Sequence, residues 1–201
     1  MPKVIDHDEQ KQKLSRCAAE LIARVGLEQT TLRNVAEAFG CTKGMVQYYF
    51  ADKEALLYEA LLYVTERYRE RAKAAAGSLR GLALIEARYT ALLPLNKELH
   101  DEWSVRVAFY ARASTIPAMQ KLLSQHYTRD LKSGIRDLQE ASKMGEVKLG
   151  LDYADAYRSI MSCVGGMGLT AVMNPTQLSP RDQVQILRQC IDALRPATQD
   201  A

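Results

Sequence analysis

A run of polar and aromatic side chains between Thr42 and Lys53 carries the most distinctive chemistry of the sequence. Gln47 can pair with adenine through two hydrogen bonds, and Lys43 can donate to guanine or to a phosphate. Tyrosine, threonine, arginine and lysine suit phosphate contacts, which position a protein on a duplex without reading its sequence. The residues expected to contact DNA are Thr31, Arg33, Thr42, Lys43, Gly44, Met45, Gln47, Tyr48, Tyr49 and Lys53.

Two short helices joined by a tight turn must position these side chains. Val46 and Phe50 are spaced i, i+4, so that if both point inward, Lys43 and Gln47 point outward. Gly40 stands where the chain must turn with a positive φ. This pattern predicts a helix-turn-helix, whose second helix enters the DNA major groove. A generic pair of bundle helices is the alternative.

Helical spacing of apolar residues extends over the whole chain. No proline occurs between Pro2 and Pro94, and Gly26 supplies a left-handed residue at the end of the first helix. We therefore predict an all-α protein with nine helices. The ranges after the first helix are 32–40, 42–50, 52–76, 78–93, 99–114, 117–143, 152–173 and 180–194.

The composition is that of an ordinary globular protein. The chain has 201 residues, 47% of them hydrophobic and 25% charged, with a formal net charge of +3. This excess of basic residues is too small to indicate nucleic-acid binding by itself. The helices change from short to long near residue 53, so we predict a DNA-binding domain at 1–53 and a second domain at 54–201.

No membrane or secretion segment is predicted. The stretch from Met1 to Gln10 has no apolar core, and the uncharged stretch from Ser159 to Pro180 has too short an apolar part to span a bilayer. We therefore expect a cytoplasmic protein with no membrane partner.

Catalysis is not expected. His7, His100 and His126 are far apart, and no G-x-S-x-G or phosphate-binding loop is present. The cysteines are Cys17, Cys41, Cys163 and Cys190. They contain no C-x-x-C pair, so we predict buried free thiols, no metal site and no cofactor.

The run from Thr31 to Leu56 resembles the DNA-binding signature of the tetracycline-repressor (TetR) family. Its Tyr-Tyr-Phe, Asp-Lys-Glu and Leu elements fall in register with the helix-turn-helix, and the resemblance covers residues of about 10 to 60. Two residues depart from the family pattern. Cys41 stands where an aliphatic residue is usual, which raises the question of a redox-sensitive thiol. Gln47 stands where an aromatic residue is common, which leaves the operator sequence open.

The resemblance implies a homodimeric repressor with nine or so helices, a C-terminal effector pocket and a dimer interface built from the last two helices. The positions that match the family's groove and phosphate contacts are Thr31, Thr42, Lys43, Gly44, Gln47, Tyr48, Tyr49 and Lys53. The expected partners are therefore an operator duplex, a second copy of the chain and a small-molecule effector that the sequence does not identify.

Two further groups of residues are candidates for these roles. The effector pocket is predicted at Tyr63, Tyr89, Trp103, Arg106, Tyr110 and Tyr127. The dimer interface is predicted at Met161, Gly165, Gly168, Leu169, Val184, Leu187, Ile191 and Leu194. For both groups, packing within the core of one chain is the alternative.

These observations predict a ligand-responsive repressor that leaves its palindromic operator when a small molecule binds. Asp52 begins the long helix two residues after Phe50, so tilting that helix would displace the reading helix. A helical protein-interaction adaptor without DNA binding is the alternative.

Overall fold

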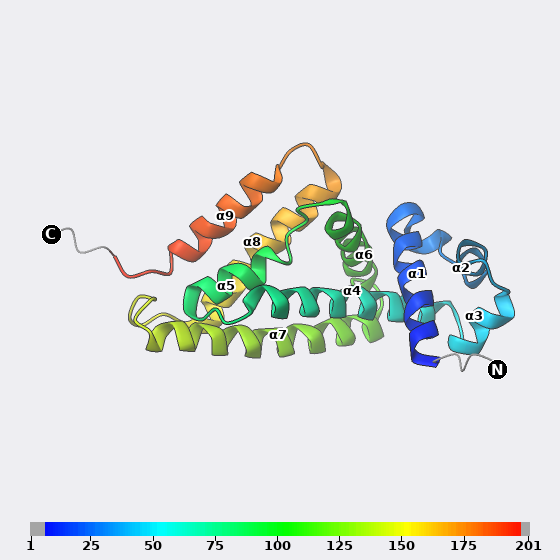
Figure 1. Cartoon of the computed structure of the whole chain (residues 1–201), viewed down its shortest axis with the longest axis horizontal. Coiled ribbons are helices and arrows are strands. Elements are labelled where there is room, and N and C mark those ends of the chain that lie inside the picture. The colour runs from blue at the N-terminus through cyan, green and yellow to red at the C-terminus, as the bar shows by residue number, and fades with distance from the viewer. Residues whose placement is uncertain (1–6, 198–201) are drawn as a thin grey trace. The chain divides into compact units, whose positions relative to one another are not determined.

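The structure is a computed structural model that describes residues 7–197, and within them it contains nine α-helices and no strand (Figure 1). The all-α prediction is therefore confirmed. The helices are α1 (His7–Gln29), α2 (Leu32–Phe39), α3 (Lys43–Tyr49), α4 (Lys53–Ala76), α5 (Gly81–Thr90), α6 (Lys97–Ala113), α7 (Pro117–Lys143), α8 (Tyr153–Met173) and α9 (Pro180–Asp192).

The ends of the helices follow local signals in the sequence. Gly26, expected to end the first helix, instead lies at a kink inside α1, with φ 83° and ψ 168°, and α1 continues to Gln29. Gly40 ends α2 in the left-handed region, with φ 78°. Asp152 accepts hydrogen bonds from the first turn of α8, and Ser179 and Asp182 form a capping box at the start of α9. These caps satisfy backbone N–H groups that a helix leaves without partners.

The chain forms two compact units. The first comprises the described residues up to Arg67 together with Asp101–Ala111, and the second comprises Tyr68–His100 and the described residues from Arg112 onward. The division therefore runs through α4 and α6 and differs from the predicted boundary between residues 53 and 54. A continuous helix such as α4 carries apolar residues for both units, which the change from short to long helices does not reveal.

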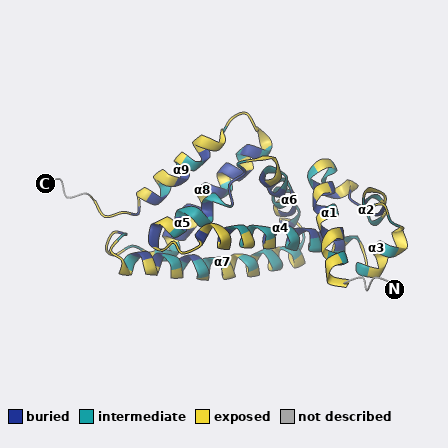
Figure 2. Ribbon diagram, in the orientation of Figure 1, coloured by how far each residue is buried: buried dark blue, intermediate teal, exposed yellow. Residues whose placement is uncertain are grey.

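The first unit has a core made by the helices around the predicted turn. α2 packs against α1 and α3, and Leu14, Val35 and Val46 are fully buried (Figure 2). Phe50 is 1% exposed, and Leu57 at the start of α4 is fully buried. The inward direction predicted for Val46 and Phe50 is thus confirmed.

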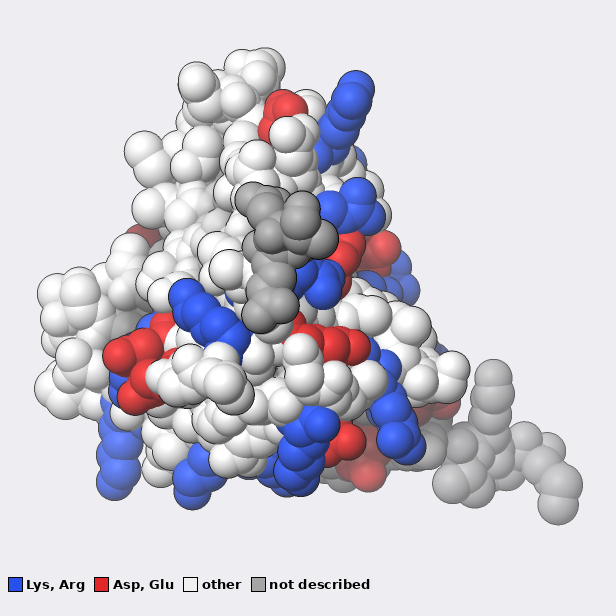
Figure 3. Space-filling view, turned by 90° about the vertical axis from the view of Figure 1, so that its left-hand side faces the viewer, with Lys and Arg blue, Asp and Glu red and all other residues white. Residues whose placement is uncertain are grey.

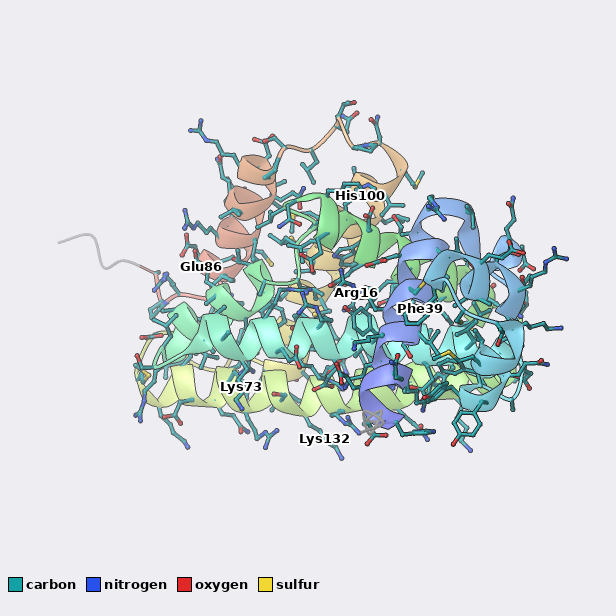
Figure 4. All side chains as sticks on the ribbon, turned by 45° about the vertical axis from the view of Figure 1, so that its right-hand side comes forward. Arg16, Phe39, Lys73, Glu86, His100 and Lys132 are labelled. Atoms are coloured by element: carbon teal, nitrogen blue, oxygen red, sulfur yellow. The ribbon has the colours of Figure 1, made fainter. Side chains whose placement is uncertain are left out.

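The second unit is built from α5, α7, α8 and α9. α7 packs against α5 and α8, and α9 packs against α5 and α8. Glu86 on α5, labelled in Figure 4, accepts a 2.6 Å hydrogen bond from Arg188 on α9. On the face shown in Figure 3, basic side chains alternate with acidic ones and do not gather into one basic patch.

Several residues predicted for the dimer interface are buried within the second unit itself. Leu187, Ile191 and Leu194 are 0%, 2% and 7% exposed within the single chain, and Gly168 is buried as well. Leu187 and Ile191 share the apolar stripe of α9, and this stripe is buried within the chain itself, whereas Leu194 lies just beyond the end of α9. A three-and-four spacing fits either packing, because both bury one side of a helix.

No helix among the described residues has an apolar stretch long enough to cross a membrane. Residues 7–197 also contain no group of three or more His, Cys, Asp or Glu side chains placed to hold a metal ion.

Candidate nucleic-acid interface

The turn between α2 and α3 is held by side-chain caps and by the conformation of Gly40. Thr31 Oγ1 accepts a 3.1 Å hydrogen bond from the Asn34 N–H at the start of α2. Thr42 Oγ1 accepts a 3.2 Å bond from the Met45 N–H at the start of α3. The Cys41 N–H donates a 2.9 Å hydrogen bond to the Ala36 carbonyl. These bonds fix where α3 begins and which of its faces is turned outward.

The two faces of α3 differ in the way a reading helix requires. Val46 is fully buried, whereas Lys43, Gly44 and Gln47 are exposed. Tyr48 is 73% exposed, which is unusual for a side chain of this size. Because the outward face combines amide, ammonium and phenol groups, it can contact both base edges and phosphates.

Gly44 leaves the outward face of α3 open to a close approach. A Cβ built at this position would meet only Thr42 Oγ1, at 3.9 Å. The backbone of Gly44 is helical, so no left-handed conformation requires a glycine here. The fold does not require a glycine at position 44, and the absence of a side chain there would allow the α3 backbone to contact another surface closely.

The flanking basic side chains have partners within the chain. Arg33 Nε lies 2.8 Å from Glu37 Oε1, one helical turn away on α2. Lys53 Nζ donates a 2.8 Å hydrogen bond to the Glu28 carbonyl at the end of α1. A phosphate would have to compete with these contacts for either side chain.

One neighbour of the interface was not found from the sequence. The ring of His7, at the start of α1, packs against Tyr48 and Tyr49 with centroid distances of 5.7 and 4.7 Å. No spacing rule connects residues that are so far apart in the chain. The sequence offered a single indication, the adjacent aromatic residues Tyr48 and Tyr49 at the end of α3.

The residues predicted to form an effector pocket have different surroundings. Trp103 and Tyr89 are buried, whereas Tyr110 and Tyr127 are 49% and 44% exposed. Tyr63 is half-buried. The first unit contains Tyr63, Trp103, Arg106 and Tyr110, and the second contains Tyr89 and Tyr127.

The structure shows contacts for three members of this group. An Arg106 guanidinium N–H donates a 3.3 Å hydrogen bond to the Val64 carbonyl in the first unit. In the second unit, the rings of Tyr89 and Tyr127 both pack against Tyr157, with centroid distances of 6.4 and 6.1 Å. Burial is the main cause that raises the pKa of Tyr89 far above its ordinary value, so its hydroxyl stays protonated.

Cys41 lacks the surroundings of a reactive thiol. Burial raises the pKa of Cys41 above its ordinary value, and the thiol donates a 3.5 Å hydrogen bond to the Thr42 carbonyl. A redox-sensitive thiol needs a lowered pKa, so these surroundings argue against that role.

The sequence matches two known protein families over most of its length. Residues 16–60 match the family of bacterial regulatory proteins called tetR. Residues 82–196 match the C-terminal domain of BetI-type transcriptional repressors, and this match covers more than half of the chain. The chain belongs to the TetR family.

Relatives of this TetR-family protein match over nearly its whole length. It is 25% identical over 197 residues to the HTH-type transcriptional regulator PksA of Bacillus subtilis, covering 96% of this chain and 94% of that protein. It is 23% identical over 185 residues to the regulator BetI of Vibrio parahaemolyticus, covering 87% of this chain and 86% of that protein.

The TetR fold is also found in solved structures. A regulator from Rhodococcus sp. assigned to the TetR family has a TM-score of 0.83 at 20% identity, covering 94% of this chain and all (100%) of that one. A transcriptional regulator from Saccharomonospora viridis, solved in complex with choline, has a TM-score of 0.82 at 22% identity. That match covers 92% of this chain and 96% of the other.

Membership of the TetR family makes the protein a DNA-binding transcriptional regulator and not an enzyme. The part that matches the family's DNA-binding region extends from α1 into α4 and contains the whole of α2 and α3.

Proposed function

We propose that the chain is a homodimeric repressor that binds a palindromic operator through α3 and releases it when a small molecule binds within residues 54–201. The observation that carries the proposal is the outward face of α3. Lys43, Gly44 and Gln47 are exposed there, while Val46 on the opposite side is fully buried. Repression, as against activation, is supported by the match to BetI-type repressors.

Each DNA contact then has a separate role. Gln47 would read a base edge in the major groove, and Lys43 would donate to guanine or to a phosphate. The tyrosines at the end of α3 and the flanking Arg33 and Lys53 would position the protein on the backbone. Gly44 would let the α3 backbone come close to the duplex.

The dimer would use the surface of α8 that the fold leaves uncovered. Gly165, Leu169 and Met173 follow one another at intervals of four residues and therefore share one face of α8. Leu169 is 44% exposed, Met173 is 75% exposed, and a Cβ at Gly165 would meet nothing within 4 Å. An apolar, open helix face of this kind suits a second copy of the chain. Met161 and the half-buried Val184 of α9 remain candidates at its edge.

The dimer surface can be tested by sedimentation. We expect Leu169→Glu combined with Met173→Glu to give a folded monomer, because the charges lie on an exposed face. Leu187→Glu is the matched comparison, and it should unfold the chain because Leu187 is fully buried. A dimer of unchanged mass in the first variant would remove this face of α8 from the interface.

The effector is expected to bind in the second unit near Tyr89 and Tyr127, the two predicted pocket residues that this unit contains. Aromatic rings attract quaternary ammonium groups, so choline, which occupies the Saccharomonospora viridis structure, is a suitable first compound for screening. Effector binding would be coupled to DNA binding through α4, whose residues belong to the first unit up to Arg67 and to the second unit from Tyr68. The Asp52 carboxylate accepts a 2.8 Å hydrogen bond from the Ala55 N–H and so joins that turn to the start of α4.

Selection of bound fragments from random DNA, followed by fluorescence anisotropy on the selected duplex, tests the function. Gln47→Ala should lose about 1–3 kcal/mol on the selected site and little on unrelated DNA. Equal losses on both would contradict the base-reading role. Affinity that does not depend on salt, or no DNA binding at all, would favour the adaptor instead.

A further inference from the structure

Three aromatic rings, one from the start of α1 and two from the end of the reading helix α3, form a partly exposed cluster. Tyr48 and Tyr49 meet edge to face, with centroids 5.1 Å apart and an angle of 88°. The His7 ring lies 5.7 Å from Tyr48 at 69° and 4.7 Å from Tyr49 at 45°. Each ring therefore contacts the other two, and the start of α1 is joined to the end of α3 (Figure 1).

Core packing accounts for only part of this cluster: Tyr49 is half-buried, with its ring centroid 6.5 Å from that of the buried Phe50. Tyr48 is 73% exposed, and the His7 side chain is 55% exposed. Rings that remain in water while holding one another in fixed orientations present their polar groups in a defined place. The Tyr48 phenol and the His7 imidazole are thus exposed together on the first unit, in contact with the half-buried Tyr49.

The chemistry of the cluster fits an anionic oxygen. Phenol and imidazole groups are both hydrogen-bond donors, and an imidazole can also carry a positive charge. Within residues 7–197, the contacts of the imidazole are with the rings of Tyr48 and Tyr49 and with the Asp8 carboxylate, whose Oδ1 lies 3.7 Å from His7 Nδ1. The Asp8 carboxylate lies on the Nδ1 side, so Nε2 is the nitrogen suited to an external acceptor.

We propose that His7 is a further DNA contact, which donates from its imidazole to a backbone phosphate that Tyr48 and Tyr49 also approach. This inference rests on the proposed use of α3 as the reading helix. The phosphate site would then consist of Tyr48 and Tyr49 from α3 and His7 from α1.

A phosphate contact made by His7 should make DNA affinity depend on pH. Histidine changes its charge between about pH 5 and pH 8. The protonated ring attracts a phosphate more strongly than the neutral ring, so DNA affinity should rise as pH falls through this range. Because phosphates are common to all sequences, the effect should appear on a duplex of arbitrary sequence.

The test measures fluorescence anisotropy of a duplex of about 30 base pairs with arbitrary sequence, at about pH 6 and about pH 7.5, over a series of salt concentrations. His7→Phe keeps a ring for packing but removes the N–H and the charge, and His7→Ala removes the ring as well. We expect His7→Phe to lose at least about 3-fold in affinity at the lower pH and to have a salt slope smaller by about 1 per protomer. His7→Ala should lose more, because Tyr48 and Tyr49 also lose their neighbour.

The control is His126→Gln, because it also removes a histidine but lies on α7 in the second unit. This variant should keep the pH dependence of the wild-type protein. Equal pH dependence in wild-type and His7→Phe proteins would overturn the inference, as would a loss that only His7→Ala shows, since that would leave packing as the sole role of the ring. If the wild-type protein did not bind DNA, the proposed function would fail as well, so the two failures are distinguishable.

Discussion

The ammonium group of Lys53, at the first position of α4, donates a 2.8 Å hydrogen bond to the backbone carbonyl of Glu28, near the end of α1. The same nitrogen lies 4.0 Å from a carboxylate oxygen of Glu28. The contact joins two helices of the DNA-binding unit and holds a cation beside the reading helix. Lys53 therefore combines a structural role with its predicted role as a phosphate contact.

Lys53→Ala should affect both roles. Loss of the hydrogen bond should lower the free energy of unfolding by about 1 kcal/mol. Loss of the cation should weaken specific and nonspecific DNA binding about equally and reduce the salt slope by about 1 per protomer. Thermal unfolding and anisotropy titrations measure the two effects separately.

Lys13→Ala is a matched control for this variant. Lys13 forms an exposed pair with Glu9 on α1, at 2.6 Å, so its replacement should change stability little. A Lys53→Ala protein with reduced stability but an unchanged salt slope would assign Lys53 to structure alone.

Gly44→Ala should separate folding from DNA binding. The position is helical and open, so alanine should stabilise α3 by about 0.5–1 kcal/mol. The added methyl group would stand between the α3 backbone and the duplex, so we expect the affinity for DNA to fall about 10-fold or more. Thermal unfolding and anisotropy should thus change in opposite directions. A more stable protein with unchanged affinity would show that the duplex does not approach this backbone closely.

The helices and the reading face could be predicted because their signals are local. Thr31, Gly40 and Thr42 act within one turn of their own positions, and the inward direction of Val46 follows from helical spacing. The contact of His7 with Tyr48 could not be predicted in this way, because it joins residues that are distant in sequence. Leu187 shows a further limit: its spacing indicated a packed helix face but not whether the packing partner was the same chain or another.

Thiol labelling should distinguish Cys190 from Cys41. Burial is the main cause that raises the pKa of Cys190 to about 11, and the nearby Cys163 thiol adds to it. The Cys190 thiol also donates a hydrogen bond to Cys163. At about pH 8 only about a thousandth of Cys190 would be the reactive thiolate, and this fraction should rise about 10-fold per pH unit.

Mass spectrometry after iodoacetamide treatment measures this difference. Burial also raises the pKa of Cys41, but no second thiol raises it further. Cys41 should therefore be labelled before Cys190. In urea all four cysteines should react at similar rates. Both cysteines are half-buried, so faster labelling of Cys190 than of Cys41 in the folded protein would contradict the higher pKa of Cys190.

Glu146 caps α5 from a distant part of the second unit. Its Oε2 accepts a 2.6 Å hydrogen bond from the Leu82 N–H, whereas Arg80 at the N-cap position supplies no side-chain bond. Gly81 has φ 58°, and a Cβ there would lie only 2.1 Å from the Glu146 carboxylate. The carboxylate thus occupies the place where a side chain at position 81 would stand, and it satisfies one N–H of the first turn.

Glu146→Ala should therefore destabilise the protein by about 1–2 kcal/mol, as expected for the loss of a helix cap. Glu146→Gln should lose less, because the amide oxygen can still accept the bond. Glu140→Ala is the control nearby in the sequence. Glu140 forms an exposed ion pair with Lys143 at 3.7 Å, so losing this pair should lower the free energy of unfolding by well under about 1 kcal/mol. Urea unfolding of the three variants measures these differences. Equal stability of Glu146→Ala and Glu140→Ala would show that α5 does not depend on this carboxylate.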